Sequence, residues 1–487
     1  MTRPRAADTG SIALRYEDGT VRVEGDEDVI EAVASDDPSL ELEADPRSGT
    51  WRAPAVRYAP LRIALANRDV DVEDRVLSLD PVSDLSSSYE LRAYQREALE
   101  SWLETDRWKS LRSILDANAD QEAPAGVLEL PTGSGKTVVA LAAIERFSVP
   151  TLVVVPTIDL LEQWQRELET EFAGDGSGDG LAVGRFGGGE QRLEPITVST
   201  YDSAYLKADS VGDRFGLAIF DEVHHLGGEG YREIARLLPA PARLGLTATF
   251  ERPDEAHEVV EDLVGPVVHR IDPDDLAGDH LAPYDVKRLE VDLTPEEREA
   301  YEENQGVFVD YLASSNIEMR RGSDYQELVK RSGRDPRARE ALLARQRARE
   351  IMLGSEAKID ALEGILDEHR EDRTIVFTAH NDLAYDVSER FLIPAITHRT
   401  SAAERREILE HFREGTYTRV VTSNVLDEGV DVPDASVAVV LSGSGSEREF
   451  TQRLGRILRP KEGGGRAILY EVVAAETGEE RIAERRR

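Results

Sequence analysis

Short apolar runs separated by polar turns divide the chain into regions of different hydrophobic period. In residues 1–88, the stretch IALRYEDGTVRVEG alternates apolar and polar positions on both sides of Asp18 and Gly19. Period-two alternation indicates half-buried strands, and an Asp-Gly step between two such strands predicts a two-residue β-hairpin turn. We therefore predict a small, mostly β module that ends in the polar linker DPVSDLSSS at residues 80–88.

From residue 89 the runs become fully apolar and alternate with helical patterns. In the first half they are TLVVVP, ITVST, LAIFDE and RLGLTAT, which begin at residues 151, 196, 217 and 243. In the second half they are TIVFT, RVVTS, SVAVVLS and AILYEVV, which begin at residues 374, 419, 436 and 467. This order is typical of α/β folds with doubly wound parallel sheets, and it predicts two such lobes, at residues 89–278 and 279–487.

A phosphate-binding loop is predicted at VLELPTGSGKT, residues 127–137. The segment matches the pattern G-x-x-x-x-G-K-S/T except that Leu130 stands at the first glycine position. The small residues 133–135 would let backbone N–H groups surround phosphate oxygens at the start of the next helix. Lys136 is expected to reach the β- and γ-phosphates and Thr137 to hold Mg²⁺. A glycine-rich turn without a ligand is the alternative.

The apolar run LAIFDEVHH ends in two carboxylates, Asp221 and Glu222. An aspartate at this strand end can hold Mg²⁺ through water, and the next glutamate can orient and deprotonate the attacking water. Hydrolysis is therefore expected, and not binding alone. We do not expect His224 and His225 to hold a metal, because adjacent histidines point in different directions and no further ligand stands nearby.

In the second lobe, QRLGRILRP places Gln452, Arg456 and Arg459 at spacings of four and three residues. On a helix these three side chains share one face. Arginines there could stabilise the charge that develops on a γ-phosphoryl group, an effect worth roughly 10³- to 10⁵-fold in rate where arginine fingers are known. A surface helix with ion pairs is the alternative for this segment taken alone.

The net charge of the chain affects whether a nucleic acid is expected as its binding partner. The chain of 487 residues has 96 Asp plus Glu against 59 Lys plus Arg, a formal net charge of -37, and only seven of the basic residues are lysine. Such an acidic surplus normally argues against a nucleic-acid partner. The composition also resembles proteins adapted to a very salty cytoplasm, where the Debye length falls to roughly 3 Å at 1 M salt. DNA therefore remains a possible partner.

Cysteine is absent, which excludes disulfides, thiolate metal sites and cysteine nucleophiles. No apolar run approaches the roughly 18 residues of a membrane span, and MTRPRAADTG has no apolar signal-peptide core. We expect a cytoplasmic protein.

Taken in order, the motifs resemble those of superfamily 2 helicases. They are LRAYQ, LPTGSGKT, VVVPT, VSTYDS, DEVHH, LGLTATFERPD, IVFTAHNDLA, IPAITHRTS, VLDEGVDVPDA and SGSGSEREFTQRLGRILRP. The sequences of these motifs are similar to those of the xeroderma pigmentosum group B (XPB) DNA helicases, especially the shorter archaeal members. The resemblance extends over nearly the whole chain. The resemblance implies two RecA-like lobes, a damage-recognition-like N-terminal domain and a helical thumb at residues 295–354.

The resemblance also implies roles for individual residues. An ATP and Mg²⁺ site would contain Arg92, Gln95, Pro131, Thr132, Gly133, Ser134, Gly135, Lys136, Thr137, Asp221 and Glu222. Gln95 would recognise adenine, and Gln452, Arg456 and Arg459 would complete the site. Gly429 and Asp431 would contact nucleotide or strand, and Thr247 and Thr249 would couple hydrolysis to lobe movement. Thr157 and Thr200 would touch DNA phosphates, although a strand-end threonine is often only a helix cap.

Two further features bear on DNA. The Arg-Glu-Asp element of the family, thought to help open the duplex, is Arg252, Pro253 and Asp254 here, so the middle carboxylate is missing. Residues 320–349 contain ten basic and four acidic residues. We hypothesise that this basic island grips the DNA backbone through Arg345, Arg347 and Arg349, whereas a solvated helical face is the alternative.

We expect an ATP-dependent DNA helicase or translocase that acts on duplex or forked DNA, in nucleotide excision repair. The family implies a structure-specific repair nuclease as partner, and a monomer is favoured. Three alternatives stay open: a duplex translocase that does not unwind, an ATP-switched scaffold for the nuclease, and an RNA helicase.

Overall fold

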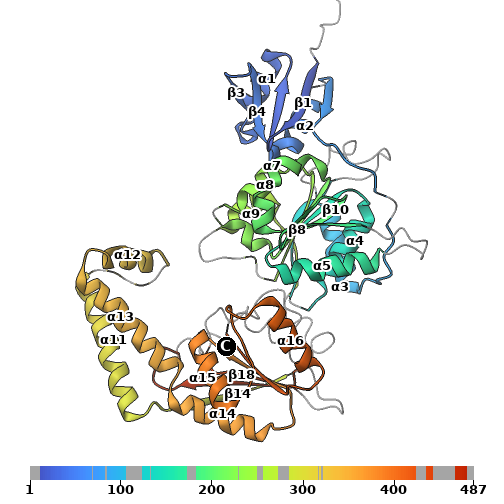
Figure 1. Cartoon of the computed structure of the whole chain (residues 1–487). Helices are drawn as coiled ribbons and strands as arrows, with labels where there is room; N and C mark the ends of the chain where they lie inside the picture. Colours follow the sequence, from blue (N-terminus) through green and yellow to red (C-terminus); the bar gives the residue numbers. More distant parts are fainter. Residues whose placement is uncertain are drawn as a thin grey trace, which may run out of the picture. The chain divides into compact units, whose positions relative to one another are not determined.

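A computed structural model describes most of the chain (Figure 1). The described residues are 11–68, 70–82, 85–105, 123–131, 133–172, 182–228, 230–248, 250, 256–271, 284–315, 317, 319, 322–423, 435–442 and 467–479. They divide into two compact units, Met1–Asp275 and Leu276–Arg487.

The N-terminal part of the first unit is a small domain built on a five-stranded sheet of order β3-β4-β2-β1-β5. The predicted hairpin is confirmed: β1 pairs antiparallel with β2, and Asp18 and Gly19 adopt positive φ angles of 47° and 79° in the turn between them. The elements are β1 Ile12–Glu17, β2 Thr20–Glu24, α1 Glu27–Asp36, η1 Pro38–Leu40, β3 Glu43–Asp45, β4 Thr50–Pro54, η2 Ala55–Arg57, α2 Tyr58–Ala66 and β5 Val72–Arg75.

The rest of the first unit is a RecA-like lobe with the sheet order β13-β6-β12-β11-β7-β10-β8-β9. All described strand pairs are parallel except β8 with β9. Helices α3, α4 and α5 cover one face, and α6 to α9 cover the other (Figure 1). The strands are β6 Ala125–Glu129, β7 Thr151–Val155, β8 Val183–Gly187, β9 Glu190–Arg192, β10 Ile196–Thr200, β11 Leu217–Asp221, β12 Ala242–Thr247 and β13 Val267–Arg270. The helices are α3 Ala93–Leu103, α4 Lys136–Phe147, α5 Ile158–Glu171, α6 Tyr201–Tyr205, α7 Ala208–Val211, η4 Gly212–Arg214, η5 Val223–Gly227, α8 Arg232–Leu237 and α9 His257–Leu263.

The second unit has a six-stranded parallel sheet of order β14-β19-β18-β15-β17-β16. Its strands are β14 Tyr284–Val291, β15 Thr374–Thr378, β16 Ala395–Ile396, β17 Arg419–Ser423, β18 Val437–Val440 and β19 Ala467–Ala474. Helices α14 Glu356–Glu368 and α15 Asn381–Phe391 pack in one core, and α16 Ala402–Arg413 packs in another. All eight strands predicted for the two lobes are therefore present. No helix within the described ranges is long and apolar enough to cross a membrane.

Between β14 and α14 the chain forms a helical thumb of α11 Pro295–Ser315, α12 Gly322–Ser332 and α13 Pro336–Leu353. Helices α11 and α13 run side by side away from the sheet, with α12 at the far end (Figure 1). The buried stripe of α13 is made of alanines at positions 338, 341, 344 and 348. Because this 3-3-4 spacing keeps small side chains on one helix face, α11 can approach closely and the arginines of α13 are left on other faces.

The N-terminal domain docks onto the first lobe through polar contacts around Tyr16. The Tyr16 hydroxyl lies 2.9 Å from the carbonyl oxygens of Ala208 and Asp209 and 3.0 Å from that of Leu237. One hydroxyl hydrogen can satisfy only one of these acceptors at a time. The burial of the ring and the negative charge of Asp213 raise the pKa of Tyr16, so the hydroxyl stays protonated and remains a donor.

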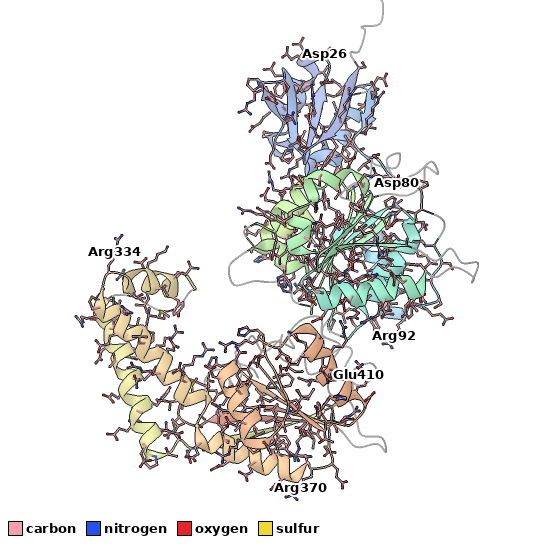
Figure 2. The ribbon with its side chains drawn as sticks, viewed as in Figure 1. Asp26, Asp80, Arg92, Arg334, Arg370 and Glu410 are labelled. Carbon is pink, nitrogen blue, oxygen red and sulfur yellow. The ribbon has the colours of Figure 1, made fainter. Side chains whose placement is uncertain are left out.

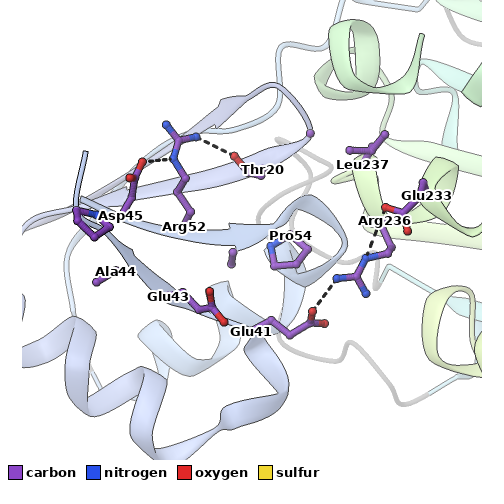
Figure 3. A pocket seen from close by; sticks show the side chains of 13 residues that line it. Thr20, Glu41, Glu43, Ala44, Asp45, Arg52, Pro54, Glu233, Arg236 and Leu237 are labelled. Atoms are coloured by element: carbon purple, nitrogen blue, oxygen red, sulfur yellow. Dashed lines mark hydrogen bonds and ion pairs between the residues drawn. The ribbon is translucent and has the colours of Figure 1, made fainter. Parts of the chain in front are cut away.

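Ion pairs extend the same interface. Glu41 accepts a hydrogen bond from Arg236 of α8 at 2.6 Å (Figure 3). Glu41 also accepts from Arg57 at 2.8 Å, and Arg57 reaches Asp262 of the lobe at 2.9 Å. Burial alone would raise the pKa of Glu41, but the two arginines outweigh it and hold the pKa below its ordinary value. A surface cavity of about 480 Å³ lies beside this contact and is lined by both domains. The N-terminal domain is thus tied to α7 and α8 by partly buried carbonyls and by charge.

Tyr16→Phe should weaken this docking. The substitution removes the donor and leaves partly buried carbonyls without it, which costs about 1–3 kcal/mol. We expect a lower midpoint for the first unfolding transition of the full chain, measured by chemical denaturation. Tyr205→Phe is the control, because Tyr205 is exposed on the same lobe. Equal midpoints for the two variants would show that the Tyr16 hydroxyl does not hold the domains together.

Candidate active site

The parallel register of the first lobe brings the carboxyl ends of β6, β12 and β11 to one edge of the sheet. Leu128 of β6 pairs with Leu246 of β12, and Leu246 pairs with Asp221 of β11. The chain leaves β6 into the predicted phosphate loop and leaves β11 at the predicted carboxylates. Ligands of open α/β sheets bind at this edge, so the predicted residues of several motifs lie where one ligand could contact them.

The phosphate loop is shaped by two left-handed glycines and ends at the start of α4. Gly133 and Gly135 have φ angles of 80° and 81°, and Lys136 is the first residue of the helix. Leu130, at the first glycine position of the pattern, is fully buried in the hydrophobic core, while its carbonyl oxygen accepts from Lys136 Nζ at 3.3 Å. Leucine is tolerated there because its side chain faces the core and only its backbone faces the lysine.

Ser134 is the point at which α3 holds the loop. Its carbonyl oxygen accepts hydrogen bonds from the Tyr94 hydroxyl at 2.8 Å and from Gln95 Nε2 at 2.7 Å. Gln95 Oε1 in turn accepts from the Arg92 backbone N–H at 2.9 Å. A Cβ atom at Gly135 would overlap Gln95 Nε2, so glycine is needed there for space as well as for its φ angle. The buried Gln95 thus bonds to the loop itself, and Tyr94 is a contact that sequence reasoning missed.

Asp221 is buried, and both of its carboxylate oxygens accept hydrogen bonds. Oδ2 accepts from Trp164 Nε1 of α5 at 2.9 Å, and Oδ1 accepts from the Glu222 backbone N–H at 3.0 Å. The Tyr201 hydroxyl donates to the Asp221 carbonyl at 3.1 Å. These donors fix the orientation of the carboxylate before any ligand arrives. Trp164 was not predicted, because its distance of 57 residues along the chain leaves no local signal.

Glu222 has a left-handed backbone, with φ 48° and ψ 55°. A non-glycine residue in this region stores about 1–3 kcal/mol of strain, and such residues cluster at functional sites. Its Oε1 lies 3.7 Å from Lys136 Nζ, and its Oε2 lies 3.6 Å from His224 Nδ1. His224 Nδ1 also lies 3.1 Å from the Thr247 hydroxyl at the end of β12. Lys136, Glu222, His224 and Thr247 therefore form one continuous polar chain.

The residues fit a magnesium nucleotide. Cations and backbone N–H groups at a helix start suit phosphate oxygens, and the Ser134 hydroxyl is a buried polar atom with no hydrogen-bond partner within the described part of the chain. The same part contains no group of three His, Asp or Glu side chains arranged to hold a metal ion. Mg²⁺ usually keeps several waters and takes phosphate oxygens besides one or two protein ligands. Half-buried Thr137 and buried Asp221 are suitable for that role.

Several predicted residues lie outside the described residues: Thr132, Thr249, Arg252, Asp254, Gly429, Asp431, Gln452, Arg456 and Arg459. The structure brings Gln95, Lys136, Asp221, Glu222 and Thr247 together through the contacts above. Pro131 belongs to the same loop, since its carbonyl accepts from the Ser134 N–H at 3.2 Å.

Thr157 and Thr200 cap helices. The Thr157 hydroxyl accepts from the Leu160 N–H at the start of α5, and the Thr200 hydroxyl accepts from the Ser203 N–H at the start of α6. The capping alternative therefore describes what both hydroxyls do, and their predicted phosphate contact stays a prediction.

The predicted basic island of the thumb separates into distinct surfaces. Arg331 and Arg334 lie near the outer end of the thumb, where Figure 2 shows Arg334 pointing away from the helices. Arg345 and Arg349 line a groove nearer the sheet. Arg347 is exposed on α13 and does not line that groove, and Arg345 is stacked between two aromatic rings. The three arginines predicted to act together therefore have different surroundings.

Comparison with protein families gives three matches along the chain. Residues 14–76 match the xeroderma pigmentosum group B helicase damage recognition domain, and residues 357–461 match the helicase conserved C-terminal domain. Residues 88–252 match the family described as type III restriction enzyme, res subunit. A Sulfurisphaera tokodaii protein named DNA 3'-5' translocase XPB2 is 43% identical over 90% of this chain and 93% of its own.

The chain belongs to the XPB family of helicases. Two further relatives are 31% identical: a Halobacterium salinarum protein named putative DNA 3'-5' helicase Rad25 and a Mycobacterium tuberculosis protein named DNA 3'-5' helicase XPB. The alignments cover 93% and 82% of this chain, but 64% and 63% of those relatives. This chain therefore spans somewhat less than two thirds of the length of those two XPB proteins.

Solved structures agree with the RecA-like fold. The Pyrococcus furiosus Hef helicase domain matches with a TM-score of 0.50 and 20% identity, over 82% of this chain and 98% of that one. A Saccharomyces cerevisiae Dbp5 variant bound to RNA and ADP BeF3 matches with a TM-score of 0.51 and 14% identity, over 89% of this chain and 90% of that one. At these identities the likeness supports the fold of the XPB chain and carries no statement about its substrate.

Trp164→Phe should impair the metal-dependent step. It removes the donor to Asp221 Oδ2 while keeping an aromatic ring in the core, and losing a residue that orients a metal ligand typically costs about 10- to 100-fold in metal affinity or activity. We expect a higher Mg²⁺ concentration for half-maximal ATP hydrolysis. Trp102→Phe is a matched control, since the buried Trp102 indole donates to the Arg243 carbonyl at 2.9 Å. The same loss in both variants would mean that only stability was affected.

Proposed function

We propose that this chain is an ATP-driven DNA helicase or translocase whose nucleotide site is the strand-end edge of the first lobe. The observation that carries the proposal is the polar chain from Lys136 through Glu222 and His224 to Thr247. It joins a phosphate-loop lysine to a carboxylate and to the end of the next strand, within contacts of 3.1 to 3.7 Å. We choose DNA as the substrate because the relatives are named as a DNA translocase and a DNA helicase.

Each side chain has a distinct task in hydrolysis. The loop N–H groups and Lys136 bind the phosphates, and Lys136 then exchanges its contact with Glu222 for one with phosphate oxygens. This exchange leaves the Glu222 carboxylate able to accept a proton from the attacking water. Mg²⁺, held by Thr137 and Asp221, would neutralise charge on the β- and γ-phosphate oxygens. Gln95 and Arg92 bind the adenine side of the nucleotide, in keeping with the resemblance.

We assign the coupling of hydrolysis to movement to Thr247 and His224 in the first lobe. Protonation of the Glu222 carboxylate alters the charge next to His224 Nδ1. The same nitrogen contacts the Thr247 hydroxyl, so the change in charge can reach the end of β12. Arg456 and Arg459, with Gln452, act on the γ-phosphoryl group from the second lobe, and Thr249, Gly429 and Asp431 take part in the same cycle. Alternate binding and release of the nucleotide then shifts the chain between two states with different affinity for DNA.

The biological setting that we propose is nucleotide excision repair on duplex or forked DNA, with a structure-specific nuclease as partner and the N-terminal domain contacting damaged DNA. The match of residues 14–76 to a damage recognition domain supports this choice.

Lys136→Ala should abolish ATP turnover, whereas Arg459→Ala should leave ATP binding nearly intact and lower kcat by about 10³-fold or more. Nucleotide binding and turnover are measured separately, by fluorescent-nucleotide titration and phosphate release. Lys207→Ala is the control, since Lys207 lies on the same lobe outside the site. Normal turnover by Lys136→Ala would refute the assigned site.

A substrate comparison separates the helicase from its alternatives. We expect ATP hydrolysis to rise with duplex or forked DNA more than with RNA, and a labelled strand to be displaced, at each of several KCl concentrations. Hydrolysis with displacement of a third DNA strand but not of a duplex strand would favour a translocase. Hydrolysis without either would favour a switched scaffold, and preferential stimulation by RNA would contradict the DNA assignment.

A further inference from the structure

The end of the predicted polar linker is bound along the first lobe. Residues 85–91, here called the strap, form neither helix nor strand, yet both leucines of this segment pack against the core of the lobe. The Leu85 N–H donates to Ser148 Oγ at 3.2 Å. The Ser87 N–H donates to Glu145 Oε1 at 3.1 Å. The strap is therefore attached to the end of α4, within the same compact unit.

One carboxylate of α5, that of Glu171, binds three consecutive residues of the strap. Its Oε1 accepts from the Ser87 hydroxyl at 2.6 Å and from the Tyr89 N–H at 3.0 Å. Ser88 donates its N–H to Oε1 and its hydroxyl to Oε2, the latter at 3.2 Å. Burial acts to raise the pKa of Glu171, but the donors from the strap outweigh it and lower the pKa. The carboxylate is therefore ionised near pH 7, and hydrogen bonds to an ionised acceptor are roughly twice as strong as neutral ones.

Glu171 projects from a helix that is firmly packed. The residues of α5 in the core of the lobe are Leu160, Leu161, Trp164 and Leu168. Trp164 also donates to the Asp221 carboxylate, so the middle of α5 is fixed independently of the strap. Loss of the contact at Glu171 would therefore release the strap and leave α5 in place.

The strap leads directly into the first turn of α3, which is fixed by hydrogen bonds more than by apolar packing. Arg92 and Ala93 are exposed, and the apolar residues that α3 places in the core begin at Ala98. The hydrogen bonds to the Ser134 carbonyl come from this turn, one of them from buried Gln95. Because little apolar surface holds the turn, the position of the preceding strap limits where the turn can lie.

We propose that Glu171 is a positioning residue for the adenine end of the nucleotide. By binding the strap to α5, it fixes the first turn of α3 before ATP arrives, and so contributes to ATP affinity without touching the ligand. The physical reason is preorganisation, since a segment that is already ordered loses less conformational freedom when a ligand binds. The proposal rests on the proposed function, in which Gln95 and Arg92 bind the adenine side of the nucleotide.

This arrangement separates binding from chemistry. Lys136, Asp221 and Glu222 are held by contacts that do not involve the strap. Release of the strap should therefore raise the KM for ATP and leave kcat and the Mg²⁺ requirement nearly unchanged. It should also reduce the selection of ATP over GTP, because the two nucleotides have the same phosphates and differ only in the base.

Glu171→Ala in the full chain should raise the KM for ATP by about 10-fold, the size of one hydrogen bond to a charged group, with kcat changed by less than about twofold. The ratio of kcat/KM for ATP to that for GTP should fall. Phosphate release is measured against the concentration of each nucleotide, with forked DNA and saturating Mg²⁺. Glu169→Ala is the matched control, because it removes the same charge from the same helix, where exposed Glu169 accepts from Gln165 at 2.7 Å.

Two further variants test the contact from both sides. Ser87→Ala combined with Glu171→Ala should raise the KM no further than Glu171→Ala alone, because both substitutions remove the same contact. Glu171→Gln keeps an acceptor oxygen, so its KM should lie between those of the unsubstituted chain and Glu171→Ala. Melting followed by circular dichroism checks that each variant folds, and Glu171→Gln carries the test if Glu171→Ala does not fold.

An unchanged KM for ATP in Glu171→Ala, or an equal rise in Glu169→Ala, would overturn the proposal. A fall in kcat at constant KM, or an equal loss of kcat/KM with ATP and GTP, would also overturn it, because a general destabilisation of the lobe would act in that way. Absence of ATP hydrolysis from the unsubstituted chain would instead refute the proposed function, so the two failures are distinguishable.

Discussion

The parallel register of β6, β12 and β11 is the constraint on which the proposed nucleotide site depends. The three strand ends lie at one edge because each strand enters the sheet in the same direction. The loop after β6 can then turn at Gly135 into α4, and the carboxylates after β11 lie close enough for Glu222 to approach Lys136. A shift of one strand by one residue would turn its alternating side chains to the opposite faces and break this convergence.

The site is held by residues that do not themselves act on a phosphate. Trp164 and Tyr201 orient Asp221, while Tyr94 and Gln95 hold the Ser134 carbonyl. These donors come from α5, α6 and α3, which pack on both faces of the sheet. The strained backbone at Glu222 is kept in place by the same packing. The apolar cores therefore stabilise a local conformation that the isolated loop would not keep.

Lysine is scarce in this chain, and two of its seven lysines are buried against similar partners. Lys136 contacts Glu222 and the Leu130 carbonyl, and Lys358 contacts Glu479 at 2.5 Å and the Leu441 carbonyl at 2.8 Å. Burial lowers the pKa of Lys358 despite the carboxylate beside it. The surface pairs that bridge the N-terminal domain and the first lobe use arginine instead, as at Arg57 and Arg236, where one planar fork can serve two acceptors.

The sequence by itself determined the hairpin at Asp18 and Gly19, eight of the strands of the two lobes and the glycine-rich turn between β6 and α4. These are local properties, because hydrophobic period and turn chemistry act over a few neighbouring residues. Only the tertiary structure decided that Gln95 bonds to the loop, that Trp164 holds Asp221 and that Arg345 stacks between Phe308 and Tyr325. The basic residues of the thumb form a single cluster in the sequence, but the structure places them in several different environments. Contacts between residues far apart along the chain depend on packing angles between helices and sheets, which no short segment encodes.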